Sequence, residues 1–291
     1  MKLEIIVLLK QVPDTRNVSE ALMTAEGLVN RNALPAIVNP QDLFALSEAL
    51  SLKSRYPGSV VRLLTMGPPS AADVLREGLW RGADSAVLLS DRALGGADTL
   101  ATSYALALAI RKMGMPDFIF CGHQSLDGDT AHVGPQVAEF LGVDQVTNCK
   151  GVSLLDQDKK ELYAVQKRHA KQAMLSVASP ALVAFSGSSS WNDTYNAHAL
   201  LTYKHAATKR EQAMHPVLTP AQFESRPYLT IEQWDANDIG AEGHRIGLQG
   251  SPTRVVHIEA VSFTPKGGEQ LTDSDADIAH LVDALTALNH G

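Results

Sequence analysis

Short apolar runs alternate with amphipathic segments along the first 145 residues of the chain. The apolar runs are rich in Val, Ile and Leu and are bounded by Gly, Pro and Asp, which is typical of buried strands. The segments between them have apolar residues at helical spacing, and the first opens on Asn39-Pro40-Gln41-Asp42, a strong helix start. This rhythm predicts βαβ units in a mainly parallel, doubly wound α/β sheet with helices on both faces. The expected strands are 3–9, 60–65, 85–89 and 117–121, and the expected helices begin at Asn39, Ala71 and Asp98.

A different pattern follows Gly142. Residues 145–155, 161–168 and 173–185 alternate or run apolar, with a polar turn of Asp, Gln and Lys after the first of them. Such short runs beside a polar turn are typical of antiparallel hairpin strands. We therefore expect a hairpin extension of the sheet over 145–185.

The C-terminal part of the chain has little periodicity. Residues 216–250 mix Pro, Asp, Asn and Gly, whereas 278–288 has the apolar spacing of a short helix. A segment of this kind cannot build a core alone. We therefore expect an α/β domain over 1–205, including the hairpin at 145–185, and an extended C-terminal arm over 206–291 that wraps a partner; a disordered tail is the alternative.

The stretch CGHQSLDGDTAHVGPQVAEFLG, residues 121–142, contains the best candidate for a binding site. An apolar strand ends at Gly122, a polar loop with Asp127-Gly128-Asp129-Thr130 follows, and an amphipathic helix runs to Gly142. The first N–H groups of a helix lack partners and its dipole adds about half a positive charge, so a phosphate is stabilised there without a lysine. A plain capped turn between strand and helix is the other interpretation.

Two more polar loops are expected beside this one. One follows the first strand at Lys10-Gln11-Val12-Pro13-Asp14, and another follows Thr65. In an open α/β sheet, loops at the carboxyl ends of the strands line the ligand crevice, so we expect the three loops to meet at one edge. Lys10 then faces either a phosphate or solvent.

Composition and charge narrow the class of function. The 291 residues are 45% hydrophobic and have a net charge of −7, which argues against a nucleic-acid surface. The chain has no run of about 18 apolar residues, and its start is too short and too soon polar for a signal peptide, so we expect no membrane insertion. Cys121 and Cys149 have no metal or redox spacing, which fits two passive thiols and a cytoplasmic location.

The motifs of several common enzyme classes are absent. We find no G-x-G-x-x-G after the first strand, no G-x-x-x-x-G-K-[ST], no G-x-S-x-G and no H-E-x-x-H. The ten histidines share no ligand spacing with cysteines or carboxylates, so we expect no metal site, and no catalytic residue is assigned. Asp127 and Asp129 are interpreted as residues that shape the loop and cap the helix, in preference to an acid–base or magnesium-binding pair.

Five ordered stretches resemble the beta subunits of electron transfer flavoproteins, over nearly the whole chain. The first is IIVLLKQVPDT, similar to the opening V-x-V-K-x-V-P-D of that family. The next two are NPQDLFALSEALSLK and LLTMGPPSAADVLREGLWRGAD. The fourth is GHQSLDGDTAHVGPQVAEFLG, similar to G-x-Q-x-x-D-G-D-T-x-Q-V-G-P, and the last is GLQGSPTRV. Five motifs in order are much more specific than any one of them.

The resemblance implies a Rossmann-like fold of the adenine-nucleotide-binding type and a heterodimer with a flavin-bearing alpha subunit. Such heterodimers accept electrons from a dehydrogenase and pass them to an acceptor. FAD is held by the alpha subunit or shared with it, and the beta chain holds AMP in the ordinary carriers or a second FAD in the electron-bifurcating members. The form D-G-D-T-x-x-V-G-P is more similar to the FAD-holding branch.

By position, the resemblance assigns the nucleotide pocket to strand ends, to the first helix start and to the phosphate loop. These residues are Leu8, Asn39, Asp42, Thr65, Met66, Gly122, Asp127, Gly128, Asp129, Thr130, Ala131, His132, Val133 and Gly134. Thr15 is assigned to the surroundings of the alpha-subunit flavin, and Tyr195 and His198 to the surface with which the family grips a dehydrogenase.

The chain departs from the family pattern at two places. His132 stands where the pattern has Gln; a neutral His donates one hydrogen bond as Gln does, so we expect binding to survive, but His also makes the loop a candidate pH responder. Residues 191–198 read WNDTYNAH in place of N-E-P-R-Y-x-x-L, so Tyr195 alone clearly remains. We therefore expect a dehydrogenase partner other than the common acyl-CoA dehydrogenase.

Two other functions stay open at this point. One is a free-standing ATP- or AMP-binding protein, or an ATP-using enzyme, of the same α/β superfamily, which the long aperiodic tail disfavours. The other is a structural interaction subunit with a vestigial pocket.

Overall fold

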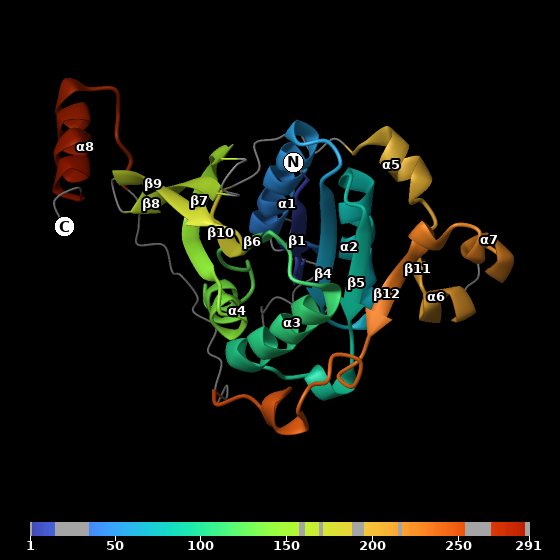
Figure 1. Ribbon diagram of the computed structural model, residues 1–291. Helices are drawn as coiled ribbons and strands as arrows, with labels where there is room; N and C mark the ends of the chain where they lie inside the picture. Colours follow the sequence, from blue (N-terminus) through green and yellow to red (C-terminus); the bar gives the residue numbers. More distant parts are fainter. Residues whose placement is uncertain are drawn as a thin grey trace, which may run out of the picture. The chain divides into compact units, whose positions relative to one another are not determined.

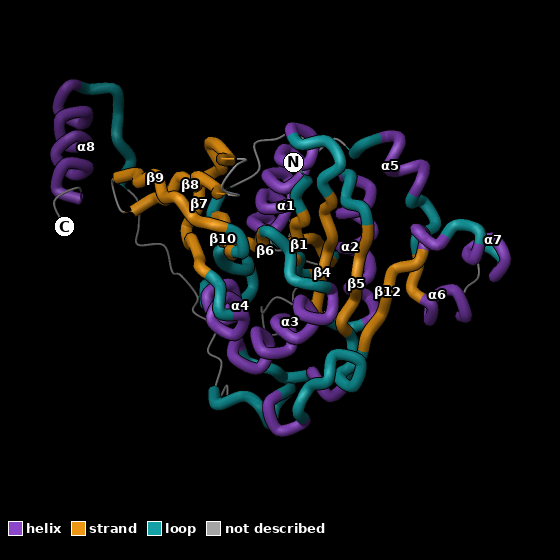
Figure 2. Tube along the Cα trace, in the orientation of Figure 1, coloured by secondary structure: helices purple, strands orange, loops and turns teal. Residues whose placement is uncertain are grey.

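Among the described residues, ten strands pair into one sheet (Figures 1 and 2). The computed structural model describes residues 2–14, 35–156, 161–168, 171–187, 195–214, 217–253 and 269–288. The strands of the sheet are β1 (Glu4–Leu8), β4 (Val60–Met66), β5 (Ser85–Leu89), β6 (Phe118–Gly122), β7 (Asp144–Asp156), β8 (Glu161–Arg168), β9 (Lys171–Ala178), β10 (Ala181–Phe185), β11 (Ala207–Thr208) and β12 (Thr230–Trp234). Their order is β11-β12-β5-β4-β1-β6-β10-β7-β8-β9. A separate antiparallel pair is formed by β2 (Gln11–Pro13) and β3 (Ala36–Val38).

The sheet is mainly parallel, as predicted. Every neighbouring pair from β11 to β7 is parallel, and the β7–β8 and β8–β9 pairs are antiparallel. Strand β1 lies between β4 and β6, with Leu8 opposite Leu64 and Val7 opposite Phe120. Parallel strands are buried on both faces, which is why the sequences of β1, β5 and β10 contain continuous apolar runs.

Helices cover both faces of the sheet. The described helices of the chain are α1 (Pro40–Arg55), α2 (Ala72–Arg81), α3 (Thr99–Met113), α4 (Val133–Leu141), α5 (Ala197–Thr202), α6 (Lys209–Met214), α7 (Pro220–Glu224) and α8 (Asp275–Leu288), with 3₁₀ turns at Pro69–Ala71, Arg92–Leu94, Pro227–Leu229 and Gly243–Arg245. Helices α1 and α2 pack on the face that contains Leu63 and Phe120, and α3 and α4 pack on the face that contains Leu64 and Ile119. Gly142 ends α4 in the left-handed conformation, with φ of 69°, as its place in the sequence predicts.

Strand β10 corrects one sequence-based prediction. The sequence predicts an antiparallel strand over 173–185, but the structure ends β9 at Ala178 and begins a separate strand after Ser179-Pro180. Strand β10 lies parallel between β6 and β7. Pro180 has no N–H to donate to a strand ladder, so the antiparallel strand stops before it.

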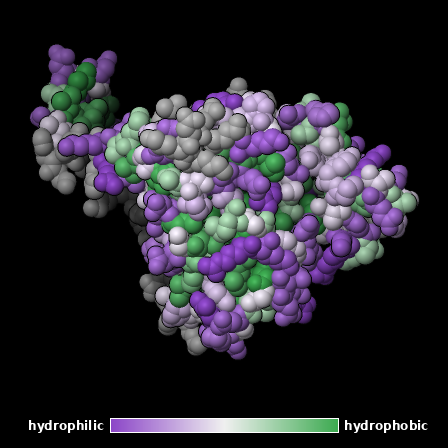
Figure 3. All heavy atoms as spheres, viewed as in Figure 1, coloured by the Kyte–Doolittle hydropathy of each residue, from purple (hydrophilic) through white to green (hydrophobic). Residues whose placement is uncertain are grey.

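Residues 206–253 take part in the α/β unit. Strand β12 pairs with β5 and β11 pairs with β12, so both extend the parallel sheet. The chain divides after Arg254 into units of residues 1–254 and 255–291, whereas the sequence pattern predicts a boundary at 205. Within the second unit, α8 has exposed apolar side chains, which give it a hydrophobic patch in Figure 3. These side chains are Ile278, Leu281, Val282 and Leu285.

Candidate functional site

The carboxyl ends of β4, β1 and β6 lie side by side, so the loops that follow them start at one edge of the sheet, as predicted. From β1 the chain continues to β4 and β5 on one side, whereas β6 lies on the other side (Figure 1). The junction of β1 and β6 is therefore the switch point at which open α/β sheets form a ligand crevice. Leu8 and Thr65, with 6% and 1% exposure, are buried there, and Met66 is half-buried. The side chains of Leu8 and Thr65 therefore point away from solvent at this edge.

The N-terminal turn of α1 holds the loop that follows β6. The Asn39 side-chain N–H donates to the Gln124 carbonyl at 3.0 Å, and the Asn39 side-chain oxygen accepts the Leu126 N–H at 3.1 Å. Gln41 accepts the Gln124 N–H at 3.0 Å. Asn39 is the N-cap residue of α1, as predicted, but its side chain makes no capping hydrogen bond to a backbone N–H of the helix. It shapes the loop instead.

Asp42 joins the loops after β1 and β6. Its carboxylate accepts the backbone N–H of Gly122 at 2.7 Å and that of Lys10 at 2.8 Å. Burial raises the pKa of Asp42 to about 6 because a buried charge is poorly solvated, although the two N–H groups and the charge of Lys10 act in the opposite direction. A Cβ at position 122 would lie 2.4 Å from the carboxylate, so this close approach requires Gly122.

The loop between β6 and α4 presents unpaired backbone N–H groups. Those of residues 130–133 have no acceptor within the described ranges. Asp129 and Ala131 have φ of 49° and 55°, in the left-handed region that non-glycine residues rarely adopt, and His132 is right-handed. Consecutive N–H groups in such alternating conformations form a concavity that favours anions, and the positive end of α4 starts at Val133.

The carboxylates of this loop act within the protein. Asp127 accepts from the Lys10 ammonium at 2.7 and 2.9 Å, which answers the question of what Lys10 faces. Burial acts to raise the pKa of Asp127, but the hydrogen bonds and the charge of Lys10 hold it below its usual value. Asp129 accepts from the Gln124 side chain at 3.1 Å. Both carboxylates therefore make contacts within the loops, as the sequence predicts, but the expected helix cap is wrong: the N-cap of α4 is the exposed His132, whose side chain makes no cap bond.

The two glycines of the loop differ in their surroundings. Gly128 is exposed, and a Cβ there would make an ordinary contact of 3.4 Å with Ser125 Oγ. Gly134 is buried, and its Cβ would lie 3.0 Å from Cys121 Sγ, so α4 begins close against β6. Thr130 is exposed and offers a hydroxyl beside the free N–H groups.

Three residues of the site were not identified from the sequence: Gln41, Gln124 and Ser125. Gln124 is the centre of this set, because it contacts Asn39, Gln41 and Asp129. Ser125 accepts from the Lys10 ammonium at 3.1 Å. Gln41 belongs to the helix start at Asn39, and Gln124 and Ser125 lie in the polar loop after β6, where Gln124 also matches the Gln of the family pattern G-x-Q-x-x-D-G-D-T.

The cysteines are buried, and burial raises the pKa of both thiols, that of Cys149 to about 11. This fits the expected passive thiols. Within the described part of the chain, no group of three His, Cys, Asp or Glu side chains is arranged to hold a metal ion. None of the described helices combines the length and hydropathy needed to span a bilayer.

The residues expected to bind partners lie elsewhere. Thr15 is outside the described residues. Tyr195 packs edge-on against Trp80, with ring centroids 6.1 Å apart, and the Arg81 guanidinium lies 5.0 Å from its ring centre. Because α2 runs antiparallel to the strands, this contact at its last turn lies at the edge of the sheet opposite the pocket loops. His198 is exposed on α5.

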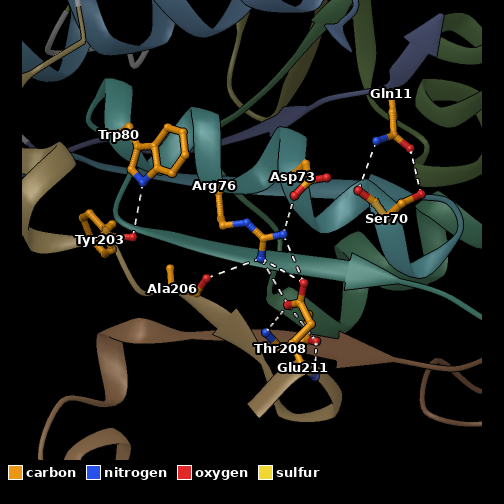
Figure 4. A network of polar contacts seen from close by, with 9 residues as sticks. All are labelled: Gln11, Ser70, Asp73, Arg76, Trp80, Tyr203, Ala206, Thr208 and Glu211. Atoms are coloured by element: carbon orange, nitrogen blue, oxygen red, sulfur yellow. Dashed lines mark hydrogen bonds and ion pairs between the residues drawn. The ribbon is translucent and has the colours of Figure 1, made fainter. Parts of the chain in front are cut away.

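A polar network attaches the segment after α5 to α2 (Figure 4). The Arg76 guanidinium donates to both carboxylate oxygens of Glu211 at 3.1 Å and to the Ala206 carbonyl at 3.4 Å. The Trp80 indole N–H donates to the Tyr203 carbonyl at 3.2 Å. Helix α2 therefore supports the chain between α5 and α6.

The fold is that of a doubly wound α/β protein. Its parallel sheet has helices on both faces and polar loops at the carboxyl edge.

Comparison with known proteins shows the family of the chain. The family model described as "Electron transfer flavoprotein domain" matches residues 27–211. "Protein FixA" of Azorhizobium caulinodans is 38% identical over 291 residues, which cover 98% of this chain and 93% of that protein. "Electron transfer flavoprotein subunit beta" of Megasphaera elsdenii is 38% identical over 293 residues, covering 97% and 96%. "Caffeyl-CoA reductase-Etf complex subunit CarD" of Acetobacterium woodii is 37% identical over 273 residues, covering 93% and 92%. The chain belongs to the electron transfer flavoprotein family, among its beta subunits.

Proposed function

We propose that the chain is the beta subunit of a heterodimeric electron transfer flavoprotein and holds an adenine nucleotide at the edge formed by β4, β1 and β6. Family membership supports the electron-transfer role. The free N–H groups of residues 130–133, at the start of α4 and beside the switch point, are the observation that carries the nucleotide proposal. A phosphate or pyrophosphate accepts these N–H groups at the positive end of the helix, with the Thr130 hydroxyl as a further donor.

The charge arrangement fits this mode of binding. Lys10, the cation beside the loop, is paired with Asp127, so the backbone and the helix dipole attract the anion. Flavin, when bound, supplies the exchange of electrons, and the protein supplies position and surroundings. We favour FAD over AMP in this pocket because of the D-G-D-T-x-x-V-G-P form of the loop. His132, exposed at the helix start, provides one ring N–H in place of the Gln amide.

The proposed partners are an electron transfer flavoprotein alpha subunit, which holds or shares FAD, and a dehydrogenase, with a cytoplasmic location. The four exposed apolar side chains of α8 support binding to another chain, because apolar patches of this kind are normally covered. Tyr195 and His198 remain the proposed contacts for the dehydrogenase, and Thr15 the proposed neighbour of the alpha-subunit flavin.

Co-expression with a candidate alpha subunit tests this function. We expect a 1:1 complex with a flavin absorption spectrum; two FAD per complex would identify the bifurcating branch, and one FAD with one AMP the ordinary carrier. A chain ended at residue 254, which lacks α8, should bind the alpha subunit more weakly. A monomer that binds ATP without any partner would contradict the proposal.

A further inference from the structure

We propose that Asp42 is a positioning residue of the nucleotide pocket, a single buried carboxylate that sets the spacing between the loop after β1 and the loop after β6. The identity of the ligand rests on the proposed function. The link that the Asp42 carboxylate makes between the two loops, here called the tie, consists of its hydrogen bonds with the Lys10 and Gly122 N–H groups. This link is a separate claim that can be tested without a ligand.

The two strands separate where Asp42 lies. The last paired residues of β1 and β6 are Val7 and Phe120. Beyond them, the N–H of Leu9 donates to β4, at the Leu64 carbonyl, and the N–H of His123 donates to β10, at the Phe185 carbonyl. The crevice of a doubly wound sheet opens at such a divergence.

The Asp42 carboxylate bridges this gap from α1. One carboxylate oxygen accepts the Lys10 N–H at 2.8 Å and the other accepts the Gly122 N–H at 2.7 Å. The side chain is 6% exposed, so water does not substitute for either contact. Glycine at position 122 permits the approach, because any Cβ would lie 2.4 Å from the carboxylate.

Both acceptor oxygens are needed. An asparagine at position 42 has one acceptor oxygen, and its NH₂ group would oppose the second backbone N–H. A protonated Asp42 has the same defect, because its O–H would point at an N–H donor. The ionised carboxylate is therefore the form that holds both loops.

The tie consequently depends on pH. Burial raises the pKa of Asp42 to about 6, so the ionised fraction of the carboxylate falls as pH decreases from 8 to 5.5. The charged or titratable groups that face it are Lys10, on the loop after β1, and the Cys121 thiol on β6. Burial and the charge of Asp42 itself raise the pKa of the Cys121 thiol, so this thiol stays protonated over the interval. The Lys10 ammonium is paired with Asp127.

FAD binding to the full-length chain tests the role of Asp42, because the pyrophosphate of FAD has no proton to lose near neutral pH. For the unmodified chain we expect FAD affinity to fall as pH decreases from 8 to 5.5. Asp42→Asn should bind FAD about tenfold more weakly at pH 8, as for the loss of one hydrogen bond to a charged group, and should lose the decrease between pH 8 and 5.5. Glu48→Gln is the matched control: Glu48 is a half-buried acid on the same helix that accepts the Val152 N–H at 3.0 Å, outside the pocket, and it should follow the unmodified chain.

Amide hydrogen exchange at pH 8 tests the tie without ligand. Asp42→Asn should exchange faster than the unmodified chain over 118–126, and Glu48→Gln should not. Unchanged exchange there, or an Asp42→Asn variant with the FAD affinity and pH profile of the unmodified chain, would overturn the proposal. Absence of FAD and AMP binding by the unmodified chain, together with faster exchange in Asp42→Asn, would count against the proposed function and leave the tie supported.

Discussion

The Asp42 carboxylate packs so closely against Gly122 at the end of β6 that no side chain fits at position 122. Adding one methyl group at this position tests the packing. Gly122→Ala brings a Cβ to within 2.4 Å of the Asp42 carboxylate and 2.9 Å of the Gln41 side chain. We expect a loss of about 2 kcal/mol in the free energy of unfolding, as for other overpacked sites. Urea denaturation measures it. Gly243→Ala is the control, because a Cβ at Gly243 meets nothing within 4 Å; equal losses in the two variants would contradict the packing described for Gly122.

The buried charge of Asp42 also has a cost in stability. Folding raises the pKa of Asp42 from 3.8 to about 6, which means that the folded protein favours the protonated carboxyl. This contribution to the free energy of unfolding is fully present below pH 3.8 and is lost as pH rises through 6. A shift of about two units corresponds to about 3 kcal/mol. We therefore expect the stability of the unmodified chain, relative to Asp42→Asn, to decrease between pH 4 and 7. Denaturation at several pH values measures this difference, and a relative stability that rises with pH would contradict the assignment.

At the scale of elements, α2 supports the segment from α5 to α6 through Arg76. Its guanidinium contacts Glu211, Asp73 and the Ala206 carbonyl, and its side chain is 18% exposed. Arg76→Ala leaves Glu211 without its cationic partner, with only the Thr208 N–H and hydroxyl still donating to it among the described residues, and should cost about 2 kcal/mol. It should also speed amide exchange over 203–214. Arg55→Ala is the control, because the hydrogen bonds of Arg55 to described residues go to Ser51 of its own helix. Similar exchange in both variants would show that the network does not hold the segment.

The elements also show what a sequence can and cannot predict. The central strands and α1–α4 were predicted because buried parallel strands are apolar runs and their helices have clear starts and glycine ends. Strand β12 was missed because its Glu232 and Gln233 interrupt any apolar run, and β10 was merged with β9 although Pro180 separates them. These are short segments whose pairing is decided by distant parts of the chain.

The same limit applies to the site. The three loops and the anion-ready helix start follow from local patterns, because any helix start offers free N–H groups. The role of Asn39 does not, since an Asn before a helix normally caps it, and the loop it contacts lies 85 residues away. The resemblance to the family supplied the position of Asp42, and the structure supplied its contacts.

At the scale of the whole molecule, the α/β unit brings the phosphate loop, the strand edge and the turn of α1 together, whereas Tyr195 lies at the opposite edge. This arrangement supports the proposal that the nucleotide binds at one edge of the sheet and that the opposite edge is left for a different partner. Family membership supports the electron-transfer role, whereas the nucleotide site is the part of the proposal that needs a direct test.

The nucleotide content of the purified heterodimer tests this claim most directly. Chromatography of the nucleotides released by acid should give one adenine nucleotide, FAD or AMP, in addition to the FAD assigned to the alpha subunit. Gly128→Val combined with Asp129→Ala should release one nucleotide fewer from an intact heterodimer, because the added side chain obstructs the loop and Asp129 no longer holds Gln124. Gly243→Val, in a turn away from the loop, should release the same amount as the unmodified complex. A loop variant that retains both nucleotides would contradict the account.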